Sequence, residues 1–295
     1  MRSIWSATST NNVNLDYVIG QHPCKKSALK TLVENQRQQD FKHISSLNIQ
    51  GKIITHLLDT TSKASLACWS TEIEKLPAPL FIFTKKALQQ QLPTASNLMR
   101  WGKTNNSSCP LCQQIQTNKH VLANCGSSAS LDRYKDRHDA VLSLLVKWIS
   151  GVIKPNCILH ADLEGHPCKP LSDLFQTLRP DIAILTPSSI ETLELTICYE
   201  TNSIKSKTYK ESKYENLHEN LNTKFMDFIL HKYTVEITTL GIISDINSFT
   251  SSNLNSSMPD HIRSEIIRTV ISKSFGIYVT AITQHELEAQ REVLV

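Results

Sequence analysis

The sequence of 295 residues lacks several features that would assign it to a class at once. No apolar run reaches ~18 residues, so it does not predict a membrane-spanning helix. The first 25 residues contain no uninterrupted apolar segment, so no secretory signal is expected. Eight cysteines are too few for a disulfide scaffold, and we expect a reducing compartment, nuclear or cytoplasmic. With 40% hydrophobic and 20% charged residues, the chain should be globular.

Charge is distributed unevenly along the chain. Residues 1–150 carry 18 Lys and Arg against 9 Asp and Glu, a balance of +9. Residues 151–295 carry 13 against 18, a balance of −5. A basic half suits a polyanion such as nucleic acid, and carboxylates in the acidic half suit a divalent metal. The alternative is that two solvated surfaces simply differ in charge.

The hydrophobic pattern changes its period once along the chain. It is helical from about residue 25 to 91, loop-like at 104–126, and helical again at 131–153. The later segments predict strands at 157–162, 180–185 and 192–199, a helix at 207–230, a strand at 233–243 and a closing helix from about 259. This order of elements predicts an α/β core.

A zinc-binding pattern lies in the loop-like segment. Cys109, Cys112, His120 and Cys125 have the spacing C-x2-C-x7-H-x4-C. Three thiolates and one imidazole can complete a tetrahedron around one zinc ion, and a closed set of four ligands indicates a structural site. The segment is too small and polar to fold on a core of its own, so the metal would stabilise it. The alternative is that these are isolated cysteines in a loop.

Two carboxylates lie at related positions of two predicted neighbouring strands. Asp181 opens the first strand, and Glu194 follows 13 residues later in the second. Side chains alternate between the faces of a strand, and Glu200 lies about 20 Å beyond Glu194 at strand rise, so only Glu194 is well placed to join Asp181. Such a pair can bind Mg²⁺ and act on a phosphodiester. The alternative is that both are ordinary surface residues.

A lysine is also useful in a site of this kind. The usual order is Pro-Asp, a spacer, then Asp/Glu-x-Lys, but Thr196 occupies the lysine position here. A substitute must come from elsewhere, and the next helix carries Lys210, Lys213 and Tyr214 on one face. The alternative is that these lysines form a solvated face.

Taken together, the motifs resemble the C-terminal part of the polyprotein of site-specific non-LTR retrotransposons that carry a restriction-like endonuclease. That family has a helical linker after its polymerase, a CCHC zinc knuckle, an Arg-His-Asp motif and then the nuclease. The matching residues, between about residues 60 and 245, are Leu92-Pro93-Thr94, Asn97 to Lys103, the four knuckle residues, Arg137-His138-Asp139, Arg179-Pro180-Asp181-Ile182, Glu194-Leu195-Thr196, Lys210, Lys213 and Tyr214.

The resemblance implies a metal-dependent DNA endonuclease with a PD-(D/E)XK restriction-endonuclease-like fold, whose nick primes reverse transcription. Asp181 and Glu194 would bind Mg²⁺, and Lys210 would be the catalytic lysine. The resemblance gives Lys213, Tyr214 and Arg137 supporting roles, although an internal salt bridge explains Arg137 equally well. It implies that His138 and Asp139 are structural rather than catalytic. The implied partner is DNA, with RNA as a further candidate, and no membrane.

The implied organisation is a helical linker region at residues 1–103, the zinc knuckle at 104–130 and the nuclease at 131–295. The chain departs from the family because it contains no Asp-Asp pair, which the polymerase of that family requires. We therefore expect a fragment, a truncated copy or a captured remnant without the polymerase. Three functions compete: an Mg²⁺-dependent endonuclease, a zinc-dependent nucleic-acid-binding module without catalysis, and a non-functional remnant.

Overall fold

The computed structural model describes residues 24–166, 175, 178–215, 229–245, 253–254 and 256–293, with side chains as far as Thr283. It divides into two compact units, Met1–Lys52 and Ile53–Val295. The predicted domain borders at residues 103 and 130 stay predictions.

The first unit contains the exposed helix α3 (Lys25–Ser46) and the start of α4 (Gln50–Thr60). The two helices meet closely at Gly51, where an added Cβ would lie 2.0 Å from the carbonyl oxygen of Ile44. Only glycine fits this junction without a shift of the backbone.

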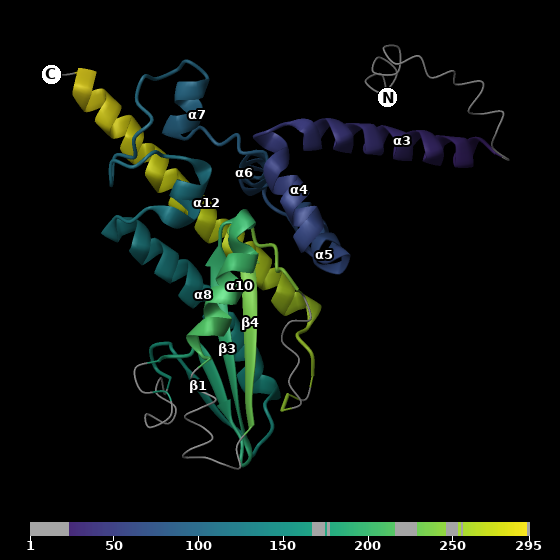
Figure 1. Cartoon of the computed structure of the whole chain (residues 1–295), viewed down its shortest axis with the longest axis vertical. Coiled ribbons are helices and arrows are strands. Elements are labelled where there is room, and N and C mark those ends of the chain that lie inside the picture. The colour runs from purple at the N-terminus through teal and green to yellow at the C-terminus, as the bar shows by residue number, and fades with distance from the viewer. Residues whose placement is uncertain are drawn as a thin grey trace. The chain divides into compact units, whose positions relative to one another are not determined.

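The second unit is built around a four-stranded mixed sheet in the order β1-β2-β3-β4 (Figure 1). Its strands are β1 (Ile158–Ala161), β2 (Ile182–Leu185), β3 (Ser189–Cys198) and β4 (Ile229–Thr238). The first three strands pair antiparallel, and β4 pairs parallel to β3. A parallel pair needs a crossover connection, and α10 (Ser203–Lys213) lies in the connection from β3 to β4.

Two long helices, α8 (Ser128–Val152) and α12 (Asp260–Val293), pack against each other and cover one face of the sheet. Their shared core contains Val141, Leu145 and Ile149 from α8 and Ile266 and Val270 from α12. Alternate apolar side chains of the strands belong to the same core: Ile182, Ile184, Leu193, Leu195, Val235 and Ile237. The opposite face of β3 and β4 carries α10 (Figure 1).

A second core joins the helical region to the end of the sheet. It includes residues of α5 (Lys63–Ile73), α6 (Ala78–Leu88), the π-helix η1 (His120–Asn124) and α12, with Leu240 and Ile242 after β4. Trp69 in α5 donates its indole N–H to the carbonyl oxygen of Leu240 at 2.7 Å. The short helix α7 (Ala95–Arg100) and the 3₁₀ turn η2 (Glu200–Asn202) complete the described elements.

The expected mixture of helices and sheet is confirmed, with the predicted order of strands. Several boundaries were wrong: β3 begins at Ser189 rather than at 192, and α10 begins at Ser203 rather than at 207. The strand predicted at 233–243 begins at Ile229 and ends at Thr238. It ends early because Gly241, with a φ of 79°, turns the chain back, so that the Thr238 N–H bonds to the carbonyl oxygen of Ile242. The helix predicted at 207–230 ends at Lys213, and residues 216–228 lie outside the described ranges.

The sequence did not predict a membrane-spanning helix, yet Asp260–Thr283 of α12 has the length and composition to cross a membrane. The core helix of a soluble protein meets the same criterion, and this segment buries Ile266, Val270 and Ile271 inside the protein.

Candidate metal centres

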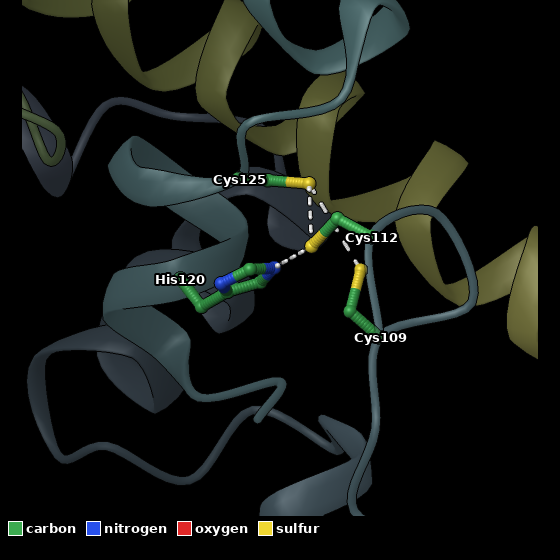
Figure 2. A group of neighbouring side chains, drawn as sticks. All are labelled: Cys109, Cys112, His120 and Cys125. Atoms are coloured by element: carbon green, nitrogen blue, oxygen red, sulfur yellow. Dashed lines mark hydrogen bonds between the residues drawn. The ribbon is translucent and has the colours of Figure 1, made fainter. Parts of the chain in front are cut away.

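The four predicted zinc ligands converge on one point, with their donor atoms all within 4.8 Å of one another (Figure 2). The Sγ of Cys125 lies 3.9 Å from that of Cys109 and 3.8 Å from that of Cys112. The Sγ of Cys112 lies 3.3 Å from Nε2 of His120. Zn–S bonds of about 2.3 Å in a tetrahedron give S···S edges of about 3.8 Å. The donor set and its spacing therefore fit a four-coordinate zinc ion.

The knuckle that carries Cys109 and Cys112 is closed by backbone hydrogen bonds. The N–H of Cys109 donates to the carbonyl oxygen of Gln114 at 2.7 Å, and the N–H of Gln113 donates to that of Cys109 at 2.8 Å. Gln113 has a φ of 63°, in the left-handed region that a tight turn of this kind requires. The turn brings both thiols to the same side.

Burial changes the protonation of the cluster in two opposite ways. Without a metal, burial raises the pKa of the Cys109 thiol to about 11, so this thiol keeps its proton at neutral pH. Burial lowers the pKa of His120, which keeps the imidazole in the neutral form that can ligate. Zinc would displace the thiol protons, and zinc binding therefore releases protons.

Helix α8 holds the second half of the zinc cluster in place. The hydroxyl of Tyr134 donates to the carbonyl oxygen of Val121 at 2.8 Å and accepts from the N–H of Cys125 at 3.1 Å. One turn later, Nη1 of Arg137 donates to the carbonyl oxygen of Leu122 at 3.0 Å. The sequence motif pointed to Arg137, but only the fold shows that Tyr134 also holds this segment in place.

Arg137 is almost fully buried and also donates to Oγ of Ser274 in α12 at 2.9 Å. Burial lowers its pKa to about 10, so it stays charged at neutral pH. Within the described part of the chain, hydrogen bonds to a carbonyl and a hydroxyl take the place of the salt bridge considered for it. Its contacts lie at η1 and α12.

The linker motif packs onto the knuckle. Asn97 in α7 donates its amide to the carbonyl oxygens of Leu92 and Gln90, which fixes the turn before the helix. The N–H of Ala95 donates to Oε1 of Gln116 at 2.8 Å, so α7 is anchored directly to the segment between the zinc ligands.

The second candidate centre lies at the junction of β2 and β3. The register pairs Ile182 with Leu193, which places Asp181, just before β2, beside Glu194 in β3. Both carboxylates are buried, with side chains 12% and 2% exposed. Oδ2 of Asp181 accepts a hydrogen bond from the N–H of Leu195 at 2.7 Å.

The three residues predicted on the following helix reach the same carboxylates. Lys210 donates to Oε2 of Glu194, and its Nζ lies 3.5 Å from Oδ2 of Asp181. Tyr214 donates its hydroxyl to Oε1 of Glu194, and Nζ of Lys213 lies 3.8 Å from that oxygen. The structure thus brings together all five residues predicted here, and one ammonium group lies against both carboxylates.

Sequence reasoning missed the contact of His138 with this centre. Its Nε2 lies 3.6 Å from Oδ2 of Asp181, and its Nδ1 lies 3.1 Å from Oδ1 of Asp139. The Arg-His-Asp motif drew attention to these residues, but nothing in the sequence shows which side chain they meet across the fold.

The charges in this centre shift one another's titration. Burial opposes the ionisation of Asp181, but His138 and the ammonium of Lys210 outweigh that effect and lower the pKa of Asp181. Burial likewise opposes the charge of Lys210, while the two carboxylates raise its pKa. Burial and the charge of Glu194 raise the pKa of Tyr214, so its hydroxyl remains a donor.

Glu200, the other carboxylate considered from the sequence, lies elsewhere. It is fully buried, and its Oε1 accepts hydrogen bonds from the Thr239 hydroxyl at 2.6 Å and the Leu240 N–H at 3.0 Å. Burial raises its pKa. It is bonded to the segment after β4, whose Leu240 contributes to the second core.

Residues 54–131 match a protein-family model described as zinc-binding in reverse transcriptase. The match links this segment to reverse-transcriptase-related proteins. It contains all four residues of the zinc cluster and both helices α5 and α6. No curated protein matches the chain. The matched family and the Cys3His cluster together indicate a zinc-dependent function related to nucleic acids.

Proposed function

We propose that this chain is the zinc knuckle and restriction-like endonuclease of a protein related to non-LTR retrotransposon reverse transcriptases. It would nick DNA with the help of Mg²⁺, and the nick would supply the 3′-hydroxyl that primes reverse transcription. This proposal includes a PD-(D/E)XK fold, for which the order α8-β1-β2-β3-α10-β4 and the mixed sheet give support.

The observation that carries the proposal is the meeting of Asp181, Glu194 and Lys210. Two buried carboxylates on adjacent strands share one ammonium group that comes from the crossover helix. Oxygen atoms that share one cation in this way also suit a divalent ion, because Mg²⁺ prefers carboxylate ligands. Lys210 would thus take the place of the catalytic lysine that the usual pattern has in the strand, where this chain has Thr196.

In the proposed reaction, Asp181 and Glu194 would hold Mg²⁺, which supplies an activated water and stabilises charge that develops on the phosphodiester. Lys210 would carry positive charge to the scissile phosphate, where a fixed donor is most effective when water is excluded. Tyr214 fixes Glu194 through its hydroxyl. Lys213, 28% exposed, can add a further cation for the DNA backbone.

The zinc cluster has a separate role in this proposal. Its four ligands leave no open position for a substrate, so the zinc would be structural. The basic residues of the first half would then contact the phosphates of DNA or RNA. We place the protein in the nucleus or the cytoplasm, where its thiols stay reduced.

The test is a plasmid-nicking assay with Mg²⁺ on the wild-type protein beside Asp181→Ala. We expect the wild type to convert supercoiled plasmid to open circles and the variant to lose this activity. Asp136→Asn is the matched control, since Asp136 is an exposed carboxylate paired with Lys273 on the far side of α8 from the site. A folded, zinc-loaded wild type that binds plasmid but leaves it intact would contradict the proposal.

The zinc-family match favours one second candidate, a nucleic-acid-binding module without catalysis. Its binding to DNA or RNA should weaken as salt rises, because bound counterions are released from the phosphates. Binding without nicking, with this salt dependence, would support it over the endonuclease. Binding that is insensitive to salt would contradict it, and a folded chain that binds nothing would indicate a remnant.

A further inference from the structure

His138 lies between two carboxylates that come from different parts of the chain. Its Nε2 faces Asp181 at the start of β2, and its Nδ1 faces Asp139, its neighbour on α8. The three side chains are 26%, 12% and 28% exposed, so the row runs from the surface into the protein. Lys135, one turn earlier on α8, pairs with Asp139 and holds the outer end.

One hydrogen-bond donor and two basic side chains converge on one of the two oxygens of Asp181. Oδ2 accepts from the Leu195 N–H at 2.7 Å and lies 3.5 Å from Nζ of Lys210 and 3.6 Å from Nε2 of His138. A cation that approaches the other oxygen, Oδ1, would meet less competition. The imidazole therefore lies where it can set the rotation of the carboxylate.

The same imidazole lines an open groove of about 1050 Å³ between α8 and the segment after β1. Lys147, Asp162 and Arg179 also line this groove. His138 is thus the side chain that connects the buried carboxylates with a groove open to solvent. A purely structural histidine on this helix would not need a partner at the candidate metal centre.

We propose that His138 is a positioning residue of the carboxylate centre: held by Asp139 through Nδ1, it orients Asp181 through Nε2 for a divalent cation. This inference rests on the proposed function and adds a residue to its site. Hydrogen-bond partners of metal ligands commonly change metal affinity by about 10- to 100-fold when they are removed.

Two substitutions of matched chemistry isolate the contact. The amide nitrogen of Gln in His138→Gln reaches the position of Nε2 and can keep the polar contact with Asp181. The amide of Asn in His138→Asn is one methylene shorter, reaches only the position of Nδ1 and keeps the contact with Asp139. Ser143→Ala is the control, because Ser143 lines the same groove on the same helix and bonds to the backbone of Asp139.

The first readout is the binding of Mn²⁺ alone to the zinc-loaded protein without DNA, measured by electron paramagnetic resonance of free Mn²⁺. We expect His138→Asn to weaken binding about tenfold. His138→Gln and Ser143→Ala should stay within about threefold of the wild type. The thermal unfolding midpoint of all three variants should stay close to that of the wild type, since His138 is partly exposed.

The second readout is nicking as a function of Mg²⁺ concentration. His138→Asn should raise the Mg²⁺ concentration for half-maximal nicking about tenfold and recover most of the rate at saturating Mg²⁺. A variant that only disturbed the helix would lose rate at every Mg²⁺ concentration.

The outcomes separate this inference from the proposed function. If Asp181→Ala abolishes Mn²⁺ binding while His138→Asn binds like the wild type, the positioning role is wrong and the metal centre of the proposed endonuclease stands. If Gln weakens binding as much as Asn, the Nε2 contact is not responsible and the inference fails. If the wild type binds no Mn²⁺, the metal centre and this inference fail together.

Discussion

The zinc cluster and the carboxylate centre both bring together side chains that can bind a metal, but the negative charges of the two centres are neutralised differently. Outside the cluster, Cys125 has neutral hydrogen-bond partners, the hydroxyls of Ser127 and Tyr134, so the thiolates depend on the metal for their main positive partner. Around the carboxylate centre the protein supplies its own cations, Lys210 and Lys213. From this comparison we expect the zinc cluster to need its ion for folding, and the carboxylate centre to fold without one.

The strongest test of this difference is removal of each metal. Chelation of zinc, or Cys112→Ser, should lower the free energy of unfolding by several kcal/mol, since structural zinc contributes about 10–16 kcal/mol to folding in zinc-finger peptides. Omission of Mg²⁺ should lower the unfolding midpoint only slightly, because a weakly bound ion stabilises the folded state only by mass action. Thermal unfolding followed by circular dichroism, with zinc content by mass spectrometry, measures both effects.

Cys24→Ser is the control for that experiment, because Cys24 is exposed and lies outside the zinc cluster. A protein that unfolds at the same temperature with and without zinc would remove the distinction between the two centres.

A second test weakens the link between the zinc cluster and α12. Arg137→Ala leaves the carbonyl oxygen of Leu122 and the hydroxyl of Ser274 without their buried donor and opens a cavity. We expect a loss of roughly 2–4 kcal/mol in the free energy of unfolding. Denaturant unfolding measures it, and the exposed Arg133→Ala, one turn earlier on α8, should change stability by less than about 0.5 kcal/mol. Equal effects of the two variants would contradict the role of Arg137.

A third test exchanges the internal cation of the carboxylate centre for an apolar side chain. In Lys210→Met, the two carboxylates lose the ammonium that competes with a metal ion, so Mn²⁺ should bind more tightly. Nicking should nevertheless fall about 100-fold, because the fixed charge at the phosphate is lost. The exposed Lys205→Met on the same helix is the control. Weaker Mn²⁺ binding in Lys210→Met would show that Lys210 supports the centre rather than competing in it.

The smallest effect concerns Glu200, a buried carboxyl without a metal role. Because burial raises its pKa, the folded state favours the protonated form, and the resulting stability is present at low pH and lost as pH rises through the raised pKa. Glu200→Gln removes this dependence and keeps the acceptor for Thr239. The unfolding midpoint of the variant minus that of the wild type should therefore increase from pH 5 to pH 8. A constant difference across this range would mean that Glu200 is ionised in the folded protein.

The sequence predicted the parts of the two centres that depend on local spacing. The zinc ligands lie within 17 consecutive residues, so their pattern carries most of the geometry. Strand alternation selected Asp181 and Glu194, and the polar Thr196 directed attention to the helix with Lys210. These inferences needed only the period of a strand and of a helix.

Contacts between distant segments could not be predicted in the same way. His138 meets Asp181 only because α8 packs on the sheet at a particular angle, and Trp69 in α5 bonds to Leu240, 171 residues later in the chain. For Arg137, an internal salt bridge was as good an explanation as a supporting role, but the fold offers a carbonyl and a hydroxyl instead. Such pairings depend on how whole elements dock, which local patterns do not encode.

Helix α8 begins at Ser128, three residues after the last zinc ligand, and carries Tyr134, Arg137 and His138 within its first three turns. One inserted residue there would rotate everything that follows by about 100°. Such an insertion would turn the imidazole away from Asp181 even if every side chain were kept. The spacing between the knuckle and the histidine is therefore under a length constraint, whereas the exposed turn at Thr186–Ser189 between β2 and β3 can change length. Among related sequences, gaps should accumulate in that turn and be rare in the first half of α8.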